Sequence, residues 1–270
     1  MRRILFRLAR LMALTGGFTA GLVTLTRAGA WTPDPGHGEV IVTTLFDQAN
    51  VAFNQSGRFT PTPLYRTLQL GAYVEVGVAD GLAALIKPSL QSSTLGAPEN
   101  QRYNGLGDSE IGAQARLWRD DASVLALQAD VRAPAAGGAS YGWLAGSKTA
   151  DFDLRLMLGK NISVGAFSGF VDLAGGFRFC GGPAPNETHA DLTFGLYVTP
   201  GLMLLAQSFN IMSAPSQNLI YPQWAQSKAQ FSLVKSLNDD WRVQIGGFTT
   251  VAGQNAYRES GALLALWRRF

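Results

Sequence analysis

Apolar and polar residues alternate along most of the chain with a period of two. Between residues 67 and 78, every even-numbered residue is apolar, whereas the odd-numbered positions include Gln69 and Glu75. Three later segments repeat this alternation, at 110–117, 152–159 and 189–198. Helical spacing would scatter the same residues around an axis, so the pattern predicts β-strands with one apolar face and one polar face.

The alternation predicts about twelve strands joined by two kinds of connection. The strands lie at 38–53, 65–78, 82–95, 109–118, 122–133, 151–159, 162–180, 188–198, 202–212, 226–236, 241–252 and 259–270. Short turns lie at 79–81, 119–121, 160–161, 199–201 and 237–240. Between them are longer connections rich in Gly, Pro, Ser and Asn, at 54–64, 96–108, 134–150, 181–187, 213–225 and 253–258.

The strict alternation of short and long connections indicates up-and-down hairpins whose two ends face different surroundings. Outer-membrane barrels have this asymmetry, with short periplasmic turns and long external loops. In hydrocarbon a sheet must close on itself, because an open edge leaves backbone groups without hydrogen bonds. We therefore predict an all-β, closed, antiparallel transmembrane β-barrel with apolar faces toward lipid and polar faces toward the lumen. The alternative is a secreted β-sandwich with the apolar faces packed together.

The first thirty residues have the organisation of a secretory signal peptide. A basic start, MRRILFRLAR, precedes an apolar stretch and the small-x-small pattern Ala28-Gly29-Ala30. We expect cleavage after Ala30, export by the general secretory route and a single barrel domain over 31–270. The alternative is an uncleaved anchor, because the apolar stretch approaches spanning length. Beyond Ala30, no apolar run reaches the roughly 20 residues of a membrane helix.

Composition narrows the function classes. The chain has 270 residues, 22 basic and 19 acidic. Five of the arginines lie in the first thirty residues, so 22 − 5 leaves 17 basic residues against 19 acidic ones, a net charge of −2. This balance gives no basic footprint for nucleic acid. The single cysteine, Cys180, excludes a disulfide scaffold and a cysteine-based zinc site, and we expect no metal and no cofactor.

The chain ends in a residue pattern that resembles the assembly signal of bacterial outer-membrane barrels. Phe270 is terminal and shares its parity with Leu264 and Leu266. We expect this strand to engage the barrel-assembly machinery. Arg268 stands where such a signal usually has an aromatic residue, which leaves the register of the last strand open.

Tryptophans gather beside the predicted short turns. Trp118, Trp241 and Trp267 all lie at strand ends on that side of the barrel. Tryptophan is enriched where a membrane meets water. We therefore expect all three to belong to an interfacial girdle.

Charged residues on the polar faces form a predicted lumen ladder of nearly equal signs. The acids are Glu75, Glu110, Asp130, Asp153, Asp172 and Asp191, and the bases are Lys87, Arg116, Arg132, Arg155, Arg178, Lys228 and Arg242. The expected pairs are Asp130–Arg155, Arg132–Asp153, Arg178–Asp191 and Glu75–Lys87. Paired charges avoid uncompensated buried charge and would narrow the lumen, which we also expect the 134–150 connection to obstruct.

Three stretches resemble a family of uncharacterised proteobacterial outer-membrane barrels, the XagA-like proteins. They read GAWTPDPGHGEVIVTTLF, ADLTFGLYVTPGLMLLAQSFNIMS and QIGGFTTVAGQNAYRESGALLALWRRF. The chain is more distantly similar to transporter barrels attached to phenol-degradation pathways. The resemblance implies an outer-membrane location and supplies no substrate or site residues.

Taken together, the patterns predict a Gram-negative outer-membrane barrel that conducts or exports a small solute through a narrow passage. Its partners would be outer-membrane lipid and that solute. A second interpretation is a non-conducting accessory barrel that acts through its external loops. A third is an outer-membrane hydrolase built on His189 and Asp191, which share a face. No nucleophile accompanies them, so we predict no enzyme activity.

Overall fold

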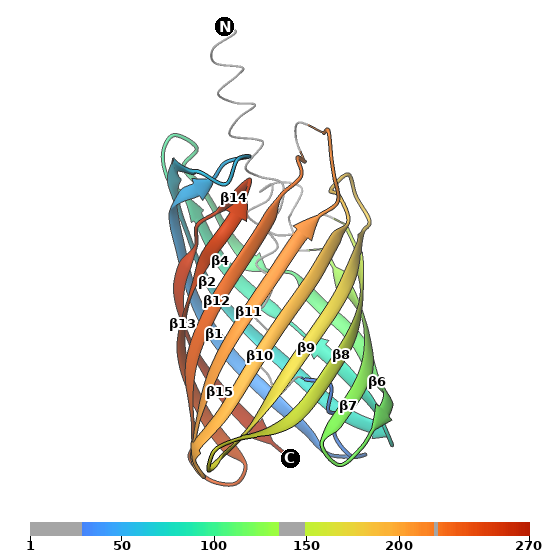
Figure 1. Ribbon diagram of the computed structural model, residues 1–270. Coiled ribbons are helices and arrows are strands. Elements are labelled where there is room, and N and C mark those ends of the chain that lie inside the picture. Colours follow the sequence, from blue (N-terminus) through green and yellow to red (C-terminus); the bar gives the residue numbers. More distant parts are fainter. Residues whose placement is uncertain (1–28, 135–148, 219–220) are drawn as a thin grey trace, which may run out of the picture.

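One antiparallel sheet closes on itself in the computed structural model, which describes residues 29–134, 149–218 and 221–270 (Figure 1). The strands are β1 (Gly38–Phe53), β2 (Phe59–Ala79), β3 (Leu82–Lys87), β4 (Ser89–Leu95), β5 (Gln101–Leu106), β6 (Ser109–Arg119), β7 (Ser123–Ala133), β8 (Asp151–Val164), β9 (Phe167–Cys180), β10 (Glu187–Thr199), β11 (Leu202–Ser213), β12 (Ala225–Ser236), β13 (Trp241–Gln254), β14 (Ala256–Tyr257) and β15 (Ser260–Arg269). The described residues contain no helix that is long and apolar enough to cross a membrane.

The fifteen segments make a barrel of twelve strands, because three strands are interrupted. β3 and β4 both pair with β2, and Pro88 separates them. β5 pairs with β4 while β6 pairs with β3, and β14 and β15 both pair with β1. Closure comes from β1, which is bonded to β2 on one side and to β15 on the other. The predicted closed antiparallel barrel is confirmed.

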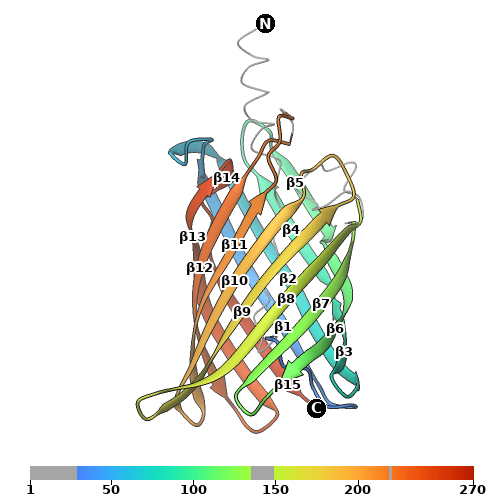
Figure 2. The same cartoon turned by 45° about the vertical axis from the view of Figure 1, so that its right-hand side comes forward.

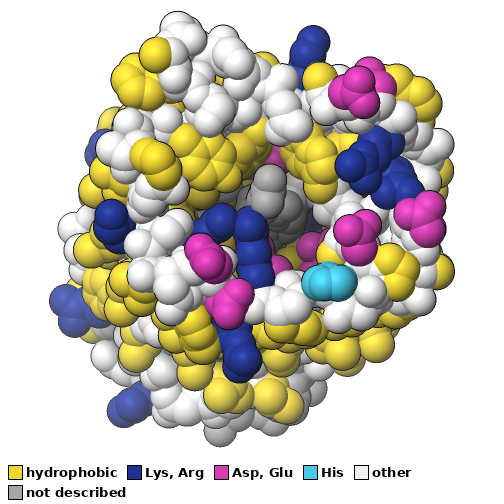
Figure 3. Space-filling view, turned by 90° about the horizontal axis from the view of Figure 1, so that it is seen from below, with side chains coloured by type: hydrophobic (Ala, Val, Ile, Leu, Met, Phe, Trp, Pro, Cys, Tyr) yellow, Lys and Arg dark blue, Asp and Glu magenta, His cyan; other side chains and the backbone are white. Residues whose placement is uncertain are grey.

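The apolar faces of the strands point outward, and the polar faces point inward. On β2, Leu68 and Leu70 are 52% and 46% exposed, whereas Gln69 between them is 3% exposed. Figure 3 looks into the end that carries the short turns and shows hydrophobic side chains around the outside and charged side chains around a central hollow. This arrangement is the inverse of a water-soluble protein, and it suits a barrel surrounded by hydrocarbon.

All five tight turns lie at the end of the barrel where the chain terminates (Figures 1 and 2). Four of them fall where the sequence predicts. The turn expected at 160–161 is wrong, since β8 continues to Val164 and the chain reverses at Gly165 and Ala166. Gly165 has a φ of 61°, a conformation that favours glycine.

The turn between β6 and β7 is held by one side chain. The backbone N–H groups of Ala122 and Ser123 donate to Asp120 Oδ1 at 2.8 and 2.6 Å. These hydrogen bonds lower the pKa of the exposed Asp120 carboxyl below its usual value, because they favour the ionised form.

At the opposite end the strands run further than the sequence predicts. β2 begins at Phe59 rather than at residue 65, and residues 101–106 form β5 although their composition suggests a loop. Ser92 on β4 and Asn104 on β5 are hydrogen-bonded through their side chains at 2.6 Å. At this end of the barrel, outward positions of the strands carry polar residues. The alternation of apolar and polar residues therefore stops before the strands themselves end.

The tryptophan girdle is only partly as expected. Trp118 is 50% exposed on the outer surface, but Trp267 is 1% exposed and faces the interior. The indole Nε1 of Trp267 donates to Gln244 Oε1 at 3.1 Å, which satisfies its polar atom inside the barrel. The assignment of Trp267 to the girdle is wrong, because odd-numbered residues of β15 point inward.

The last strand has the register that its apolar residues suggest. Leu264, Leu266 and Phe270 are exposed on the outer surface. Arg268 lies on the same side, with its guanidinium 5.3 Å from the ring centroid of Trp241 on β13. A cation–π contact thus accommodates a charged residue at a position where an aromatic residue is usual. The role of these residues in assembly stays a prediction.

Candidate functional site

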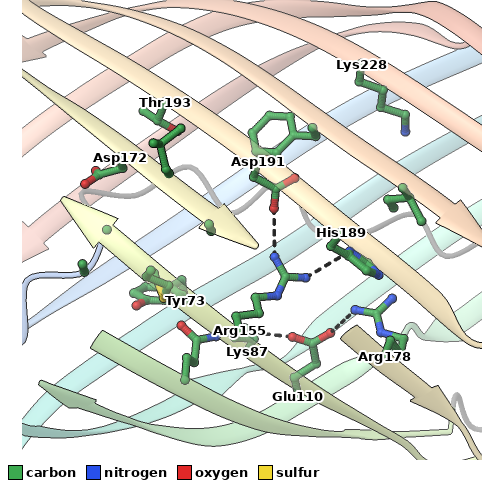
Figure 4. Close-up of a pocket in the computed structure, with 18 of the residues that line it drawn as sticks. Tyr73, Lys87, Glu110, Arg155, Asp172, Arg178, His189, Asp191, Thr193 and Lys228 are labelled. Atoms are coloured by element: carbon green, nitrogen blue, oxygen red, sulfur yellow. Dashed lines mark hydrogen bonds and ion pairs between the residues drawn. The ribbon is translucent and has the colours of Figure 1, made fainter. Parts of the chain in front are cut away.

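The interior of the barrel contains a cavity of about 100 Å³. Its lining comes from strands on opposite sides of the barrel, from Lys87 on β3 to Lys228 on β12 (Figure 4). A water molecule needs roughly 10–15 Å³ of such volume, so the cavity has room for a small cluster of water molecules and is not a wide aqueous pore.

Lys87 and Arg132 organise the part of the cavity wall formed by β3, β6 and β7. Lys87 Nζ lies 3.1 Å from Glu110 Oε2 and 3.1 Å from Asp130 Oδ2. Arg132 donates to the other Glu110 oxygen at 3.2 Å and to Asp108 at 3.3 Å. Both cations are buried, so each requires these carboxylates as compensation for lost hydration.

Arg155 and Arg178 continue the network across β8, β9 and β10 (Figure 4). Arg155 contacts Asp153 at 2.7 Å and Asp191 at 2.9 Å, while Arg178 contacts Asp153 at 2.9 Å and Glu187 at 3.2 Å. Arg178 also approaches Glu110 at 3.7 Å, which links the two halves of the network. We call this set of ion pairs, from Lys87 to Asp191, the charged wall.

The residues expected in the lumen ladder lie in the interior, but the expected pairs are wrong. Asp130 lies directly opposite Asp153, and Arg132 lies opposite Asp151, which is a shift of two residues from the predicted register. Two carboxylates can face each other because Lys87 neutralises Asp130 while two arginines neutralise Asp153.

The other two expected pairs are also wrong. Arg178 lies opposite Glu187, and Asp191 binds Arg155 instead. Glu75 lies opposite Leu85, while the Lys87 ammonium points to Glu110 and Asp130. Long cationic side chains reach across neighbouring strands, so adding residue numbers across a hairpin does not identify their partners.

The remaining predicted ladder residues lie outside the charged wall. Arg116 pairs with Asp80 at 2.6 Å at the short-turn rim. Lys228 pairs with Glu259 and lies 5.6 Å from the ring of Phe248. Asp172 is 8% exposed and lies in the interior at the short-turn end, where Trp31 also lies. Arg242 is two residues before the buried Gln244 on β13, so both side chains lie on the inward face of that strand.

The interior holds more acids than the sequence pattern suggested. Six further carboxylates lie in the interior, namely Glu39, Asp47, Asp108, Asp151, Glu187 and Glu259, and one further base, Arg269, pairs with Glu39 at 3.0 Å. The described interior therefore has twelve acids against eight bases, and the expected balance of charge is wrong. The alternation along the strands could have revealed two of these acids. Asp151 lies on the same face of β8 as Arg155, and Glu187 lies on the same face of β10 as Asp191.

Uncharged amide and hydroxyl groups make up much of the opposite part of the interior, alongside the Lys228–Glu259 ion pair. Gln230 Nε2 donates to Gln207 Oε1 at 2.8 Å, and Gln207 Nε2 donates to Thr193 Oγ1 at 3.1 Å. Gln226 Nε2 donates to Thr250 Oγ1 at 3.2 Å. We call these side chains on β10 to β13 the amide wall. The lumen therefore has one side that is dense in ion pairs and one side on which most of the polar groups are neutral.

Residues 29–36 enter the short-turn end of the barrel and lie against its inner surface. Ala30 is fully buried among Val124, Ala126 and Met157. The ring of Trp31 packs edge-on against Phe170 at 6.5 Å. We call residues 29–36 the inner segment, which the sequence patterns did not predict.

Two glycines make room for the inner segment. A Cβ at Gly159 would lie 2.2 Å from the Trp31 ring, and a Cβ at Gly77 would lie 2.3 Å from the Asp34 carbonyl oxygen. The inner segment is thus fitted to the wall, and it narrows the passage at this end. The expected obstruction by the 134–150 connection concerns residues 135–148, which lie outside the described residues.

The predicted signal peptide also lies mostly outside the described residues, which begin at Gly29. Ala28 is not described, whereas Ala30 is buried in the barrel. Cleavage after Ala30 stays a prediction, and it would leave Trp31 at the start of the inner segment.

Both ring nitrogens of His189 contact neighbouring charged groups. Its Nδ1 accepts from Arg155 at 3.3 Å, and its Nε2 lies 3.1 Å from Glu187, to which it donates. Within the described residues, no hydroxyl or thiol group is bonded to the imidazole. Both ring nitrogens are occupied, so His189 has no free nitrogen with which to activate a nucleophile.

Comparison with known proteins shows that the fold is shared with solved outer-membrane barrels. No family model and no curated protein matches the sequence. The structure is similar to an outer membrane channel from Pseudomonas putida F1, with a TM-score of 0.70 and 15% identity over 91% of this chain and 100% of that one. It is also similar to the NanC porin, with a TM-score of 0.52 and 10% identity over 86% of this chain and 100% of that one.

A third structure extends the comparison to a different kind of barrel. The translocator domain of the autotransporter NalP from Neisseria meningitidis has a TM-score of 0.54 and 12% identity, covering 99% of this chain and 96% of that one. The shared feature is the fold of outer-membrane β-barrels. The resemblance to the XagA-like proteins stays a prediction, because no family model supports it.

Proposed function

We propose that the protein is a narrow outer-membrane channel for small solutes. The observation that carries this proposal is a closed barrel with an outward apolar surface and an interior cavity that charged side chains help to line. The similar structure from Pseudomonas putida F1 is described as an outer membrane channel, which supports the same activity here.

The outer membrane of a Gram-negative cell is the proposed location. A chain whose strands expose leucine, valine and phenylalanine around the barrel needs a hydrocarbon surrounding. The signal-like first thirty residues support export by the general secretory route. Leu264, Leu266 and Phe270 are proposed to present the assembly signal on the outer surface of β15.

The channel is expected to prefer cations, because twelve acids and eight bases lie in its interior. Reversal potentials in planar bilayers under a KCl gradient measure this preference. We expect the sign that corresponds to potassium permeation, and a smaller potential in Glu259→Gln. Lys235→Gln, which removes an exposed outward charge, serves as the control and should leave the potential unchanged. An anion-selective current would contradict this expectation.

A second candidate function is a non-conducting accessory barrel that acts through its outer loops. The inner segment and the ion pairs that fill much of the interior favour this alternative. A protein that stays silent in bilayers, even after removal of the inner segment, would support it. We do not propose catalysis, because both ring nitrogens of His189 are hydrogen-bonded and neither is free to act as a general base.

A further inference from the structure

Acidic and basic side chains are distributed differently between the two surfaces of the barrel. In the described strands every carboxylate points inward, from Glu39 on β1 to Asp191 on β10. Basic side chains point both ways, and several lie on the outer surface among exposed leucines and valines. An outward arginine with no outward carboxylate beside it is available to an anionic partner from the surroundings.

Arg66 and Arg102 are two such cations that lie in one row. Arg66 on β2 lies opposite Thr94 on β4, and Thr94 lies opposite Arg102 on β5. The three side chains therefore form one row across three adjacent strands. Strands are spaced about 4.8 Å apart, so the two arginine Cα atoms are separated by about 10 Å.

Two of the three next outward positions toward the membrane centre, two residues further along the strands, are also polar. Leu68, Ser92 and Asn104 occupy the next outward positions on the same three strands. Ser92 and Asn104 are hydrogen-bonded to each other at 2.6 Å and are exposed or half-buried. We call Arg66, Ser92, Thr94, Arg102 and Asn104 the outer arginine patch.

The height of the patch matches the edge of the apolar belt. On β2 the outward residues from Leu68 to Val78 are all apolar, and Arg66 is the next outward residue toward the long-connection end. Ten residues of tilted strand span about 25 Å, the height of the lipid-facing band of outer-membrane barrels. Arg66 and Arg102 thus lie where lipid headgroups of the outer leaflet would begin.

Neither arginine is neutralised by the protein. Within the described residues, the ion pairs lie in the interior or at the short-turn rim, and neither Arg66 nor Arg102 belongs to one. Guanidinium groups bind phosphate through paired charge-assisted hydrogen bonds. Two of them at headgroup level, with hydroxyl and amide groups between, complement a sugar headgroup that carries two phosphates.

We infer that the outer arginine patch binds the phosphorylated glucosamine headgroup of lipid A, the anchor of lipopolysaccharide. This inference rests on the proposed outer-membrane location. It adds a specific lipid partner, held on the outer surface of β2, β4 and β5 with its acyl chains along the leucines below. Lipid A would also cover the strand segment in which polar outward residues replace the apolar belt.

The test is binding of purified lipid A to the full-length protein in detergent. We expect Arg66→Gln/Arg102→Gln to weaken binding about tenfold, since charge-assisted bonds to both phosphates are lost. The matched control is Lys160→Gln/Lys235→Gln, which removes two outward cations at the short-turn end. It should change the affinity by less than about twofold. Heat-modifiable migration establishes that both variants fold.

Three outcomes would overturn the inference. They are unchanged affinity in the arginine variant, equal losses in both variants, and binding of cardiolipin as tight as that of lipid A. Monophosphoryl lipid A should bind more weakly than the bisphosphorylated form. Conductance in pure phospholipid bilayers does not require lipid A, so failure of the channel proposal would be seen there separately. Cell fractionation tests the location independently.

Discussion

A variant that lacks residues 31–36 is expected to conduct ions roughly threefold better than the full protein, because the interior of a twelve-strand barrel is wider than the passage that remains. The deletion removes Trp31 from its contact with Phe170 and leaves β1 intact from Gly38. Single-channel recording in planar bilayers measures the effect. The result separates a constriction made by the inner segment from one made by the charged wall.

A point variant serves as the control for this deletion. Trp31→Ala removes the ring but keeps the backbone, so its conductance should lie between those of the full protein and the deletion. Equal conductance in all three proteins would show that the inner segment does not limit the passage. In that case the charged wall would be the constriction.

Replacing Lys87 by methionine is expected to destabilise the barrel by about 3–5 kcal/mol, the usual cost of leaving buried carboxylates uncompensated. The ammonium lies 3.1 Å from both Glu110 and Asp130, and the Lys87 and Asp130 side chains are 5% and 2% exposed. Urea unfolding followed by tryptophan fluorescence in detergent measures the loss.

A second substitution distinguishes charge from packing. Lys87→Met/Asp130→Asn removes one of the two stranded charges and should recover part of the lost stability. Lys235→Met, at an exposed outward position, should change stability by no more than about 0.5 kcal/mol. An unfolding midpoint for Lys87→Met equal to that of the unaltered protein would show that Lys87 does not hold the wall together.

The barrel was predictable from sequence because period-two alternation reports which face of a strand meets lipid. That signal is strong on β2, where the outward residues from Leu68 to Val78 are uniformly apolar. It fails in β5, where Arg102 and Asn104 occupy outward positions. It also misplaced the turn between β8 and β9, which lies at Gly165 rather than at 160–161.

The sequence predicted which charged residues point into the interior, but not which of them form ion pairs with one another. Parity placed Asp130, Arg132, Asp153 and Arg155 inside, yet the register differs by two residues from the one that paired them. Arginine and lysine reach beyond the directly opposite position, so several registers satisfy the same charges. The inner segment could not be foreseen, because residues 29–36 contact strands far away in sequence.

The division of the lumen into a charged wall and an amide wall affects how a solute would travel through it. Because most of the ionised groups lie on one side, the electric field has a component across the axis as well as along it. A dipolar molecule entering this field would be turned so that its positive end tracks the acid-rich strands. Selection by such a passage would act on the orientation of a molecule as well as on its size.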